Sequence, residues 1–323
     1  MGEDQVPADA GRAEHYAEFY GVRELPGPEV LVVLGNCQSE ALRQLISSGP
    51  TSSAVPPSVR IPPVFELTAQ DLPRLHRVLS RTSVLVAQPV REDYRGLPLG
   101  TGQLAEHLPD AATTVRIPAL YDSSLFPWMV TIRHPDRPDE DPPVVPYHDL
   151  RTLAEAAAEL DGGSRAPEEP APVRLPLAPE RIRGLAQASL DRLRERERAH
   201  ATLSVADRIA GLAVPAFHTI NHPANEVLAL LASAVRADLG ADPAVTVPAR
   251  TLLGDVLAPL EPQVLAALEV TGPSRSGWTI HGDEVSDALV RSAHLDWYRE
   301  NPEAVRAGVE RHRRLLADLG LGA

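Results

Sequence analysis

The sequence contains one cysteine and no lysine, and only 4% of its 323 residues are aromatic. A single cysteine excludes an internal disulfide framework. No window approaches the roughly 18 uninterrupted apolar residues that a membrane-spanning helix needs. The first twenty residues are acidic and polar and lack the basic start and apolar centre of a secretory signal. We therefore expect a soluble globular protein of the cytoplasm, without a membrane span.

Arginine supplies all 31 basic side chains, against 44 acidic ones, and the net charge is −13. Affinity for the phosphate backbone of nucleic acids comes mostly from clustered cations. The charge balance therefore argues against a nucleic-acid partner, although single arginines can still hold a phosphorylated ligand. With 43% apolar residues, the chain is long enough to bury one large core or two modest ones.

The first third of the sequence alternates between two hydrophobic patterns. Short apolar runs predict strands, and segments with helical spacing follow each of them. The predicted strands are 29–35, 63–67, 83–90 and 113–120, and the predicted helices are 39–48, 68–81 and 100–109. Such alternation predicts an α/β fold with a parallel sheet flanked by helices.

The remainder of the chain is mainly helical in its pattern. Two segments, 134–146 and 161–179, contain too much proline and charge for regular structure and are interpreted as insertions. The predicted helices are 147–162, 179–209, 224–240 and 302–320. We therefore expect three parts: an N-terminal extension (1–28), an α/β catalytic domain (29–240), and a mainly helical C-terminal region (241–323) packing on it.

Cys37 lies at the joint between the first predicted strand and the helix after it. In open α/β sheets, ligands collect at the carboxyl ends of strands, where the next helix presents free N–H groups and a positive dipole end. We expect this position to lower the pKa of the thiol and to direct the amides of residues 37 and 38 at an oxyanion. The alternative is a small buried hydrophobic residue. The polar neighbours Asn36 and Gln38 favour the first interpretation.

His222 lies just before a proline and the predicted helix 224–240, a junction from which a base can reach across a cleft. Asn221 or Asn225 can orient its ring or bind substrate. His218 and His222 also have the spacing of two metal ligands, but the proline and the lack of a companion Glu or Cys argue against zinc, and we expect no metal. A hydrogen-bonded loop histidine is the other alternative.

Several segments carry a resemblance through their order and spacing. They are Gly35-Asn36-Cys37-Gln38, the strand ending in Gln88 with "VREDYRGLPLGT" at 90–101, "RIPALYDSSLFPW" at 116–128, the "YHDLRTL" helix start, and "TINHPANEVL" at 219–228. Together they resemble the WcbI-type family of polysaccharide-biosynthesis acetyltransferases.

The resemblance implies an SGNH/flavodoxin-like fold, coenzyme A as the carrier of the acyl donor, and transfer of an acyl group to a hydroxyl of a sugar, glycan or secondary metabolite. It implies a nucleophile turn at Gly35-Asn36-Cys37-Gln38, a histidine motif at Asn221-His222, and a polar side chain, Gln88, beside the oxyanion. SGNH hydrolases place an Asp three residues before the catalytic His, where this chain has Thr219. The third member of a triad therefore stays open.

Further site candidates come from the loops after the predicted strands. Phosphates of the coenzyme require Arg or backbone amides. The candidates near the coenzyme are Gly35, Arg91, Arg95, Arg116, Arg133 and Asn221. Those for substrate contacts are Asp93, Tyr94, Tyr121 and Asn225. A solvated arginine is the alternative for each basic residue, and the aromatic residues around Tyr121, Phe126 and Trp128 either line an acceptor pocket or belong to the core.

The resulting hypothesis is acyl transfer with Cys37, Asn36, Gln38, Gln88 and His222 at the catalytic site. Cys37 takes the acyl group from a thioester, His222 moves the proton, and an acceptor hydroxyl displaces the enzyme thioester. In a variant, Cys37 only binds and His222 activates the acceptor for direct attack. A hydrolase with the same site and a non-catalytic ligand-binding protein are the alternatives. The sequence does not identify the acyl group, the acceptor or the oligomeric state.

Overall fold

The computed structural model describes residues 8–160, 162 and 176–321. The chain forms two compact units, each assembled from several segments. Unit 1 contains residues up to 121 with 191–211 and 222–253, and unit 2 contains 122–190, 212–221 and the residues from 254 onward. The predicted boundaries at residues 28 and 240 do not coincide with the limits of these units. Most of the insertion predicted at 161–179 lies outside the described residues.

Unit 1 contains a four-stranded parallel sheet in the order β2-β1-β3-β4. Its strands are β1 (Val30–Leu34), β2 (Ser58–Val59), β3 (Thr82–Ala87) and β4 (Thr113–Arg116). The prediction of a parallel sheet flanked by helices is confirmed. After β1 the chain adds β2 on one side of it and then β3 and β4 on the other side. The strand order therefore reverses between β1 and β3, and a ligand-binding crevice is expected beyond the carboxyl ends of these two strands.

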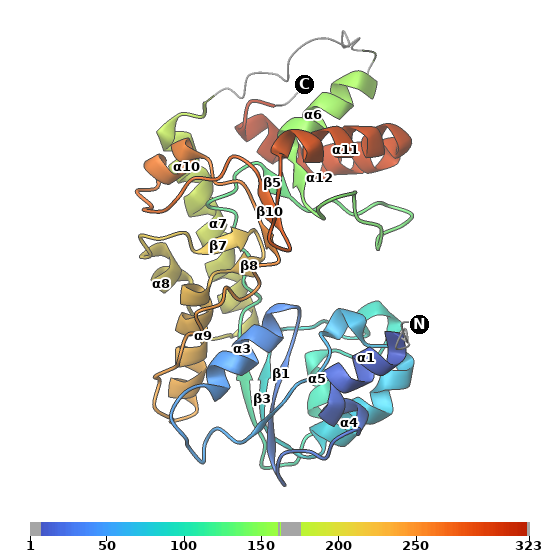
Figure 1. Ribbon diagram of the computed structural model, residues 1–323, viewed down its shortest axis with the longest axis vertical. Coiled ribbons are helices and arrows are strands. Elements are labelled where there is room, and N and C mark those ends of the chain that lie inside the picture. Colours follow the sequence, from blue (N-terminus) through green and yellow to red (C-terminus); the bar gives the residue numbers. More distant parts are fainter. Residues whose placement is uncertain (1–7, 161, 163–175, 322–323) are drawn as a thin grey trace, which may run out of the picture. The chain divides into compact units, whose positions relative to one another are not determined.

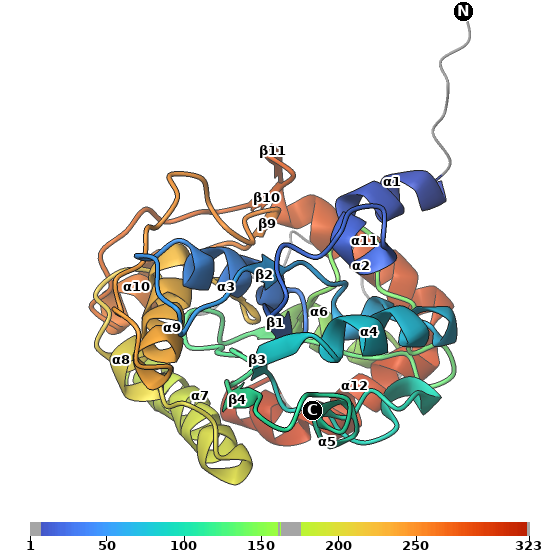
Figure 2. The same ribbon diagram turned by 90° about the horizontal axis from the view of Figure 1, so that it is seen from below.

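Both faces of the sheet are covered, which is why all five residues of β1 are buried. One face packs on α2 (Ala17–Tyr20), α4 (Leu72–Leu79) and α5 (Thr101–Ala105) in a single hydrophobic cluster. Helices α3 (Gln38–Ser47) and α9 (Asn225–Asp238) pack against each other. Figure 1 shows α3 and α9 on one side of the strands and α4 and α5 on the other, and Figure 2 shows the strands between α3 and α5.

Helices α3 and α9 run in the same direction, and a buried arginine fixes this arrangement. Arg236, near the end of α9, donates hydrogen bonds to the carbonyl of Ile46, near the end of α3, at 2.8 Å and to that of Pro50 at 2.7 Å. Gly49 leaves room for the guanidinium, because a Cβ there would lie 2.4 Å from Arg236 Cζ. The first residues of the two helices therefore lie toward the same end of this helix pair.

The predicted strand at 63–67 was wrong. This segment forms the 3₁₀ turn η1 (Val64–Glu66), and the edge of the sheet is formed by β2 instead. Pro62 and Pro63 lack the N–H donors of a strand ladder. The N–H of Val64 bonds to the carbonyl of Gly35 at 2.8 Å, so the segment closes the turn after β1 rather than pairing along it.

The long helix predicted at 179–209 was too long. Helix α7 (Pro179–His200) ends before Ala201, whose φ is 49°, and a separate helix α8 (Ala206–Ala210) follows. The reason is the buried carboxylate of Glu197, which accepts the N–H groups of Val205 at 2.8 Å and Ala206 at 3.0 Å. This side chain stabilises a new helix start, which hydrophobic spacing does not reveal.

Unit 2 combines small antiparallel sheets with helices. Strand β5 (Met129–Val130) pairs with β6 (His148–Asp149), and β10 (Trp278–Ile280) lies between β9 (Val256–Leu257) and β11 (Asp283–Val285). Its helices are α6 (Leu150–Leu160), α10 (Pro262–Ala267), α11 (Asp287–Glu300), α12 (Pro302–Asp318) and the first half of α7. They enclose a second hydrophobic core.

The remaining elements are short. They are α1 (Ala8–His15), η2 (Ala69–Asp71), η3 (Tyr94–Gly96), β7 (Phe217–Thr219) and β8 (His222–Pro223). Strand β7 belongs to unit 2 and β8 to unit 1. Over the described ranges, every helix is too short or too polar to cross a bilayer.

Candidate functional site

The turn after β1 places Cys37 at the carboxyl edge of the sheet, directly before α3. The Asn36 side-chain oxygen accepts the N–H of Gln38 at 2.9 Å, which closes a tight local turn around the cysteine. The Asn36 carbonyl accepts the N–H of Ser39 at 3.0 Å. Cys37 is thus held in a helical conformation, with φ −55° and ψ −19°, at the N-cap position of α3.

Gln88, at the end of β3, holds this turn from the neighbouring strand. Its side-chain oxygen accepts the N–H of Asn36 at 2.9 Å, and its Nε2 donates to the Gln38 side-chain oxygen at 3.0 Å. Gln88 is buried, and so is Gln38, which bonds to both backbone groups of Leu120 at 2.7 and 3.0 Å. The structure thus brings Asn36, Gln38 and Gln88 together, and in it the two glutamine side chains position the turn.

The thiol of Cys37 is half-buried, and burial raises its pKa. The backbone N–H groups of Cys37 and Gln38 act on the sulfur in the opposite direction and lower the pKa, but the effect of burial is larger. The expectation of a lowered thiol pKa was therefore wrong. The helix start supplies the expected donors, yet the covering side chains remove the water that would solvate a thiolate.

His222 is the first residue of the short strand β8, which directly precedes the N-cap of α9, and it belongs to the same unit as Cys37. Helices α3 and α9 run in the same direction, so their N-terminal ends lie at the same end of the helix pair. Cys37 directly precedes the N-terminal end of α3, and His222 precedes that of α9. His222 is half-buried. The two predicted reactive residues thus precede two helices of unit 1 that pack against each other, and their roles in catalysis remain predictions.

The two predicted asparagines of this motif make different contacts. Asn225 holds the segment that follows α9: its Nδ2 donates to the carbonyl of Arg250 at 2.9 Å, and its Oδ1 accepts the N–H of Leu252 at 2.8 Å. Asn221 belongs to unit 2, where its Oδ1 accepts the hydroxyl of Tyr147 at 2.8 Å. Contacts of either residue with coenzyme or substrate stay predictions.

The loop after β3 carries four of the predicted binding residues. Asp93 has a left-handed backbone, with φ 49°, and its carboxylate accepts a hydrogen bond from Gln103 at 2.8 Å. The ring of Tyr94 packs against the hydrophobic cluster beneath the sheet, and Arg95 donates to the carbonyl of Phe65 at 3.1 Å. Arg91 is exposed. Asp93 and Arg95 are exposed as well, whereas Tyr94 is half-buried.

Other predicted residues lie farther along the chain. Arg116 is the exposed last residue of β4. The backbone carbonyl of Tyr121 accepts a hydrogen bond from Arg196 at 2.8 Å. Arg133, in unit 2, contacts Asp141 at 3.3 Å at the surface. In the parts of the chain that the structure describes, His, Cys, Asp and Glu side chains do not gather in threes as metal ligands would.

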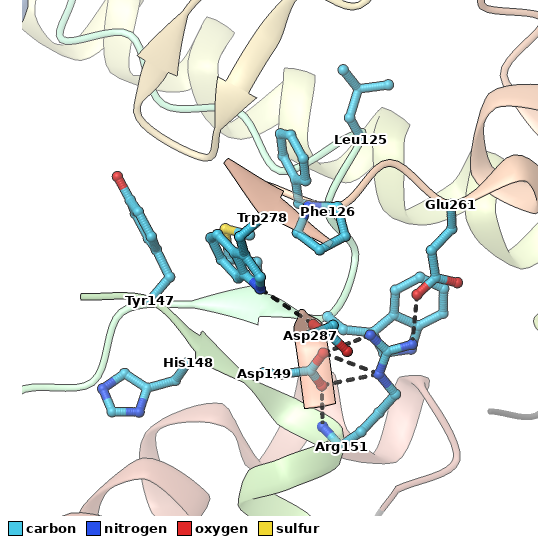
Figure 3. Close-up of a pocket in the computed structure, with 12 residues that line it drawn as sticks. Leu125, Phe126, Tyr147, His148, Asp149, Arg151, Glu261, Trp278 and Asp287 are labelled. Atoms are coloured by element: carbon cyan, nitrogen blue, oxygen red, sulfur yellow. Dashed lines mark hydrogen bonds and ion pairs between the residues drawn. The ribbon is translucent and has the colours of Figure 1, made fainter. Parts of the chain in front are cut away.

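Unit 2 contains a small pocket lined by aromatic and charged side chains (Figure 3). Its wall includes Phe126 and Trp128, from the stretch interpreted as either pocket or core, and both are buried. Its polar residues are Asp149 and Arg151, at the start of α6, and Glu261, which precedes α10. Sequence reasoning did not assign these three residues to a site, because they converge only through tertiary packing.

The sheet order and the strand-to-helix turn define an α/β protein with a parallel sheet and a cysteine beside two backbone N–H groups at the carboxyl edge of that sheet. The model of the family described as "Polysaccharide biosynthesis enzyme WcbI" matches residues 30–244. This chain therefore belongs to the WcbI family of polysaccharide biosynthesis enzymes.

A solved structure shares the fold. It is WcbI, described as a novel polysaccharide biosynthesis enzyme, as the native protein without a disulfide bond between coenzyme A and a cysteine. The similarity has a TM-score of 0.71 at 18% sequence identity and covers 91% of this chain and 99% of that chain. No curated protein sequence matches the chain.

Proposed function

We propose that this protein transfers an acyl group from a coenzyme A thioester to a hydroxyl group of a sugar, glycan or secondary metabolite. The observation that carries the proposal is the position of Cys37, at the carboxyl edge of a parallel sheet, with two backbone N–H groups acting on its sulfur. His222 precedes α9, the helix that packs on α3. The family relation to polysaccharide biosynthesis enzymes supports it, and so does the mention of coenzyme A and a cysteine for the solved WcbI structure.

The side chains of unit 1 fit a thioester donor. Arg91 follows β3 and Arg116 ends β4, so both exposed guanidinium groups lie at the edge of the sheet that carries Cys37. Arginine at such an edge matches the phosphates of the coenzyme. The half-buried sulfur matches the uncharged thioester end, because neither group requires strong solvation.

The raised pKa of Cys37 determines the order of proton movements. The resting thiol is protonated near neutral pH, so His222 takes the proton as the sulfur bonds to the acyl carbon. The N–H of Cys37 stabilises the oxyanion, while the N–H of Gln38 also bonds to Asn36. The bond from the acyl carbon to the coenzyme sulfur then breaks, and the coenzyme leaves as a thiol with the proton from His222.

In the second half of the reaction, His222 accepts the proton of the acceptor hydroxyl. The acceptor oxygen bonds to the acyl carbon, the bond to Cys37 breaks, and the thiol of Cys37 regains a proton. Water in place of the acceptor gives hydrolysis by the same residues. The acceptor pocket therefore determines the outcome, not the nucleophile.

Intact-protein mass spectrometry after mixing with acetyl-CoA tests the proposal. We expect one added acetyl group on the wild-type protein, none on the Cys37→Ala variant, and acylation slowed by about 100-fold or more in His222→Asn. Arg313→Ala, which changes an exposed ion pair on α12, is the matched control and should acylate normally. Acetyl transfer to a glycan acceptor by Cys37→Ala would refute a covalent mechanism. Equal loss of thioester with and without acceptor would identify a hydrolase.

A further inference from the structure

The pocket of unit 2 has aromatic walls, and an arginine of the same unit already covers the face of one ring. The guanidinium of Arg151 lies 4.2 Å from the ring centroid of Trp128, in a cation–π contact. The rings of Tyr147 and Trp278 stack nearly parallel, with centroids 6.2 Å apart and an interplanar angle of 13°. Figure 3 shows Tyr147, Arg151 and Trp278 among the side chains that line the pocket. The pocket thus combines apolar ring surface with one fixed cation.

Carboxylates hold that cation in place. Arg151 Nη2 bonds to Asp149 at 2.5 Å, and Arg151 Nη1 bonds to Glu261 at 2.7 Å (Figure 3). A third carboxylate, Asp287, accepts the indole N–H of Trp278 at 3.2 Å. The four charged side chains of the wall therefore carry a formal net charge of −2. Each of them has a fixed orientation, because each is bonded to a neighbour within unit 2.

The charge pattern argues against an anionic ligand, and the position of Arg151 argues against an organic cation on Trp128. An anion such as a phosphate would meet three carboxylates, and the arginine that could bind it is already paired with two of them. An organic cation would find the Trp128 face occupied by Arg151 and would be repelled by that guanidinium. A ligand that is neutral, has an apolar face and carries groups that both donate and accept hydrogen bonds satisfies the carboxylates and the guanidinium together.

We propose that this pocket binds one neutral sugar ring, with a C–H face against the aromatic wall and hydroxyl groups on Glu261, Asp149 and Arg151. The pocket is small, which suits a single ring rather than a long chain. All lining residues belong to unit 2, so this site is built without Cys37 or His222. It goes beyond the acyl-transfer proposal, because it needs no acyl donor.

The protein's own tryptophans report on this site. Of the three in the sequence, Trp128 and Trp278 line the pocket, whereas Trp297 packs in the core cluster of α11 and bonds to Glu140. The full-length Trp297→Phe protein therefore isolates the pocket fluorescence. It is titrated, without coenzyme A, with the methyl pyranosides of glucose, mannose and galactose, and with glucuronate and choline as charged controls.

We expect at least one neutral methyl pyranoside to bind at millimolar concentration and to change the fluorescence, and glucuronate and choline to bind more weakly. Adding Trp278→Ala should weaken binding about tenfold or more. Glu261→Gln, which keeps the shape of the side chain, should weaken binding about threefold to tenfold. It replaces Trp278→Ala as the test if that variant does not fold. Ligand-observed NMR measures binding to the Trp278→Ala protein.

Three results would overturn this inference. The first is that none of the methyl pyranosides binds. The second is that glucuronate or choline binds more tightly than every neutral pyranoside. The third is that Trp278→Ala or Glu261→Gln, whichever is folded, leaves the affinity unchanged. Because acyl transfer is not measured, these outcomes are independent of the fate of the acyl-transfer proposal.

Discussion

The side-chain oxygen of Gln88 accepts the backbone N–H of Asn36 at 2.9 Å, across the carboxyl ends of two neighbouring parallel strands. The same oxygen explains the glycine before it, because a Cβ on Gly35 would lie 2.4 Å from it. The residue that follows β3 thus determines which residue can follow β1. The turn that carries Cys37 depends on this fit.

Gly35→Ala should therefore destabilise the protein by about 2 to 4 kcal/mol, because the added methyl group displaces a buried, hydrogen-bonded side chain. Chemical denaturation measures this loss. In a Gln88→Ala background the same substitution should cost less, since the clashing atoms are gone. Equal costs in both backgrounds would show that Gly35 and Gln88 are not coupled. Gly184→Ala, in a helix where an added Cβ has open space, is the matched control.

The alkylation of Cys37 should report its raised pKa. Burial favours the neutral thiol, so the thiolate forms only above the pKa of ~8.5 of a free cysteine. The rate of reaction with iodoacetamide, measured against pH, should have its midpoint above that value. Since Cys37 is the only cysteine, all label belongs to it. A midpoint below the free value would show that the backbone N–H groups outweigh burial and that the thiolate is preformed.

The same shift affects stability in alkali. The folded-state pKa is raised, so the contribution of the protonated thiol is fully present below the unfolded pKa and is lost as the pH rises through the folded pKa. In Cys37→Ala this alkaline loss should be smaller than in the wild type. Urea unfolding of both proteins above and below ~8.5 measures the difference, and parallel pH profiles would argue against it.

Arg236 is expected to be the main lock between α3 and α9. It is 1% exposed and donates to three backbone carbonyls, those of Ile46, Pro50 and Asp242. Arg236→Leu leaves these acceptors without partners and should cost about 3 kcal/mol or more. Arg236→Lys should restore part of the stability. Arg250→Leu, which removes an exposed hydrogen bond to Gln44, should change stability by under about 1 kcal/mol.

The link to activity is geometric. If Arg236 sets the alignment of α3 and α9, then Arg236→Lys should slow acylation of Cys37 even where the protein is fully folded, because it shifts His222 relative to the sulfur. Acylation rates well below the unfolding transition test this. An unchanged rate in a destabilised variant would confine Arg236 to a structural role.

His148 should make unit 2 sensitive to acid. Burial and the nearby His294 lower its pKa to about 3. A lowered histidine pKa contributes stability above the unfolded value of ~6.5 that is lost as the pH falls toward the folded value. Between pH ~7 and ~5 the loss should be about 2 kcal/mol. His148→Gln should lack it, so its unfolding free energy should depend less on pH over this range. Identical slopes for the two proteins would exclude His148 as the cause.

The sequence pattern alone predicted the positions of the elements that have strong hydrophobic periodicity. Strand β1, helix α3 and helix α9 lie within a residue or two of their predicted bounds, because buried apolar runs and amphipathic spacing act within one segment. The segment at 63–67 misled for the opposite reason. Its apolar residues are those of a strand, but two prolines and a hydrogen bond to Gly35 make it a turn.

The candidate site was likewise predictable from the sequence only in part. The position of Cys37 follows from strand, turn and helix signals in adjacent residues, and so could be predicted. The pKa of its thiol was predicted in the wrong direction, because the helix start is visible in the sequence and the burial is not. Likewise, "YHDLRTL" predicts a helix start, but nothing in it shows that Arg151 faces Trp128 and Glu261.

The sequence by itself determined the alternation of strands and helices, the glycine-containing turn and the single thiol placed at its end, since each of these depends on neighbouring residues. The tertiary structure decided which side chains meet across long separations: Gln88 with Asn36, Arg236 with Ile46, Arg151 with Glu261. Those contacts set burial, and burial sets the strength of every charge and hydrogen bond in the two candidate sites, because water no longer competes for them.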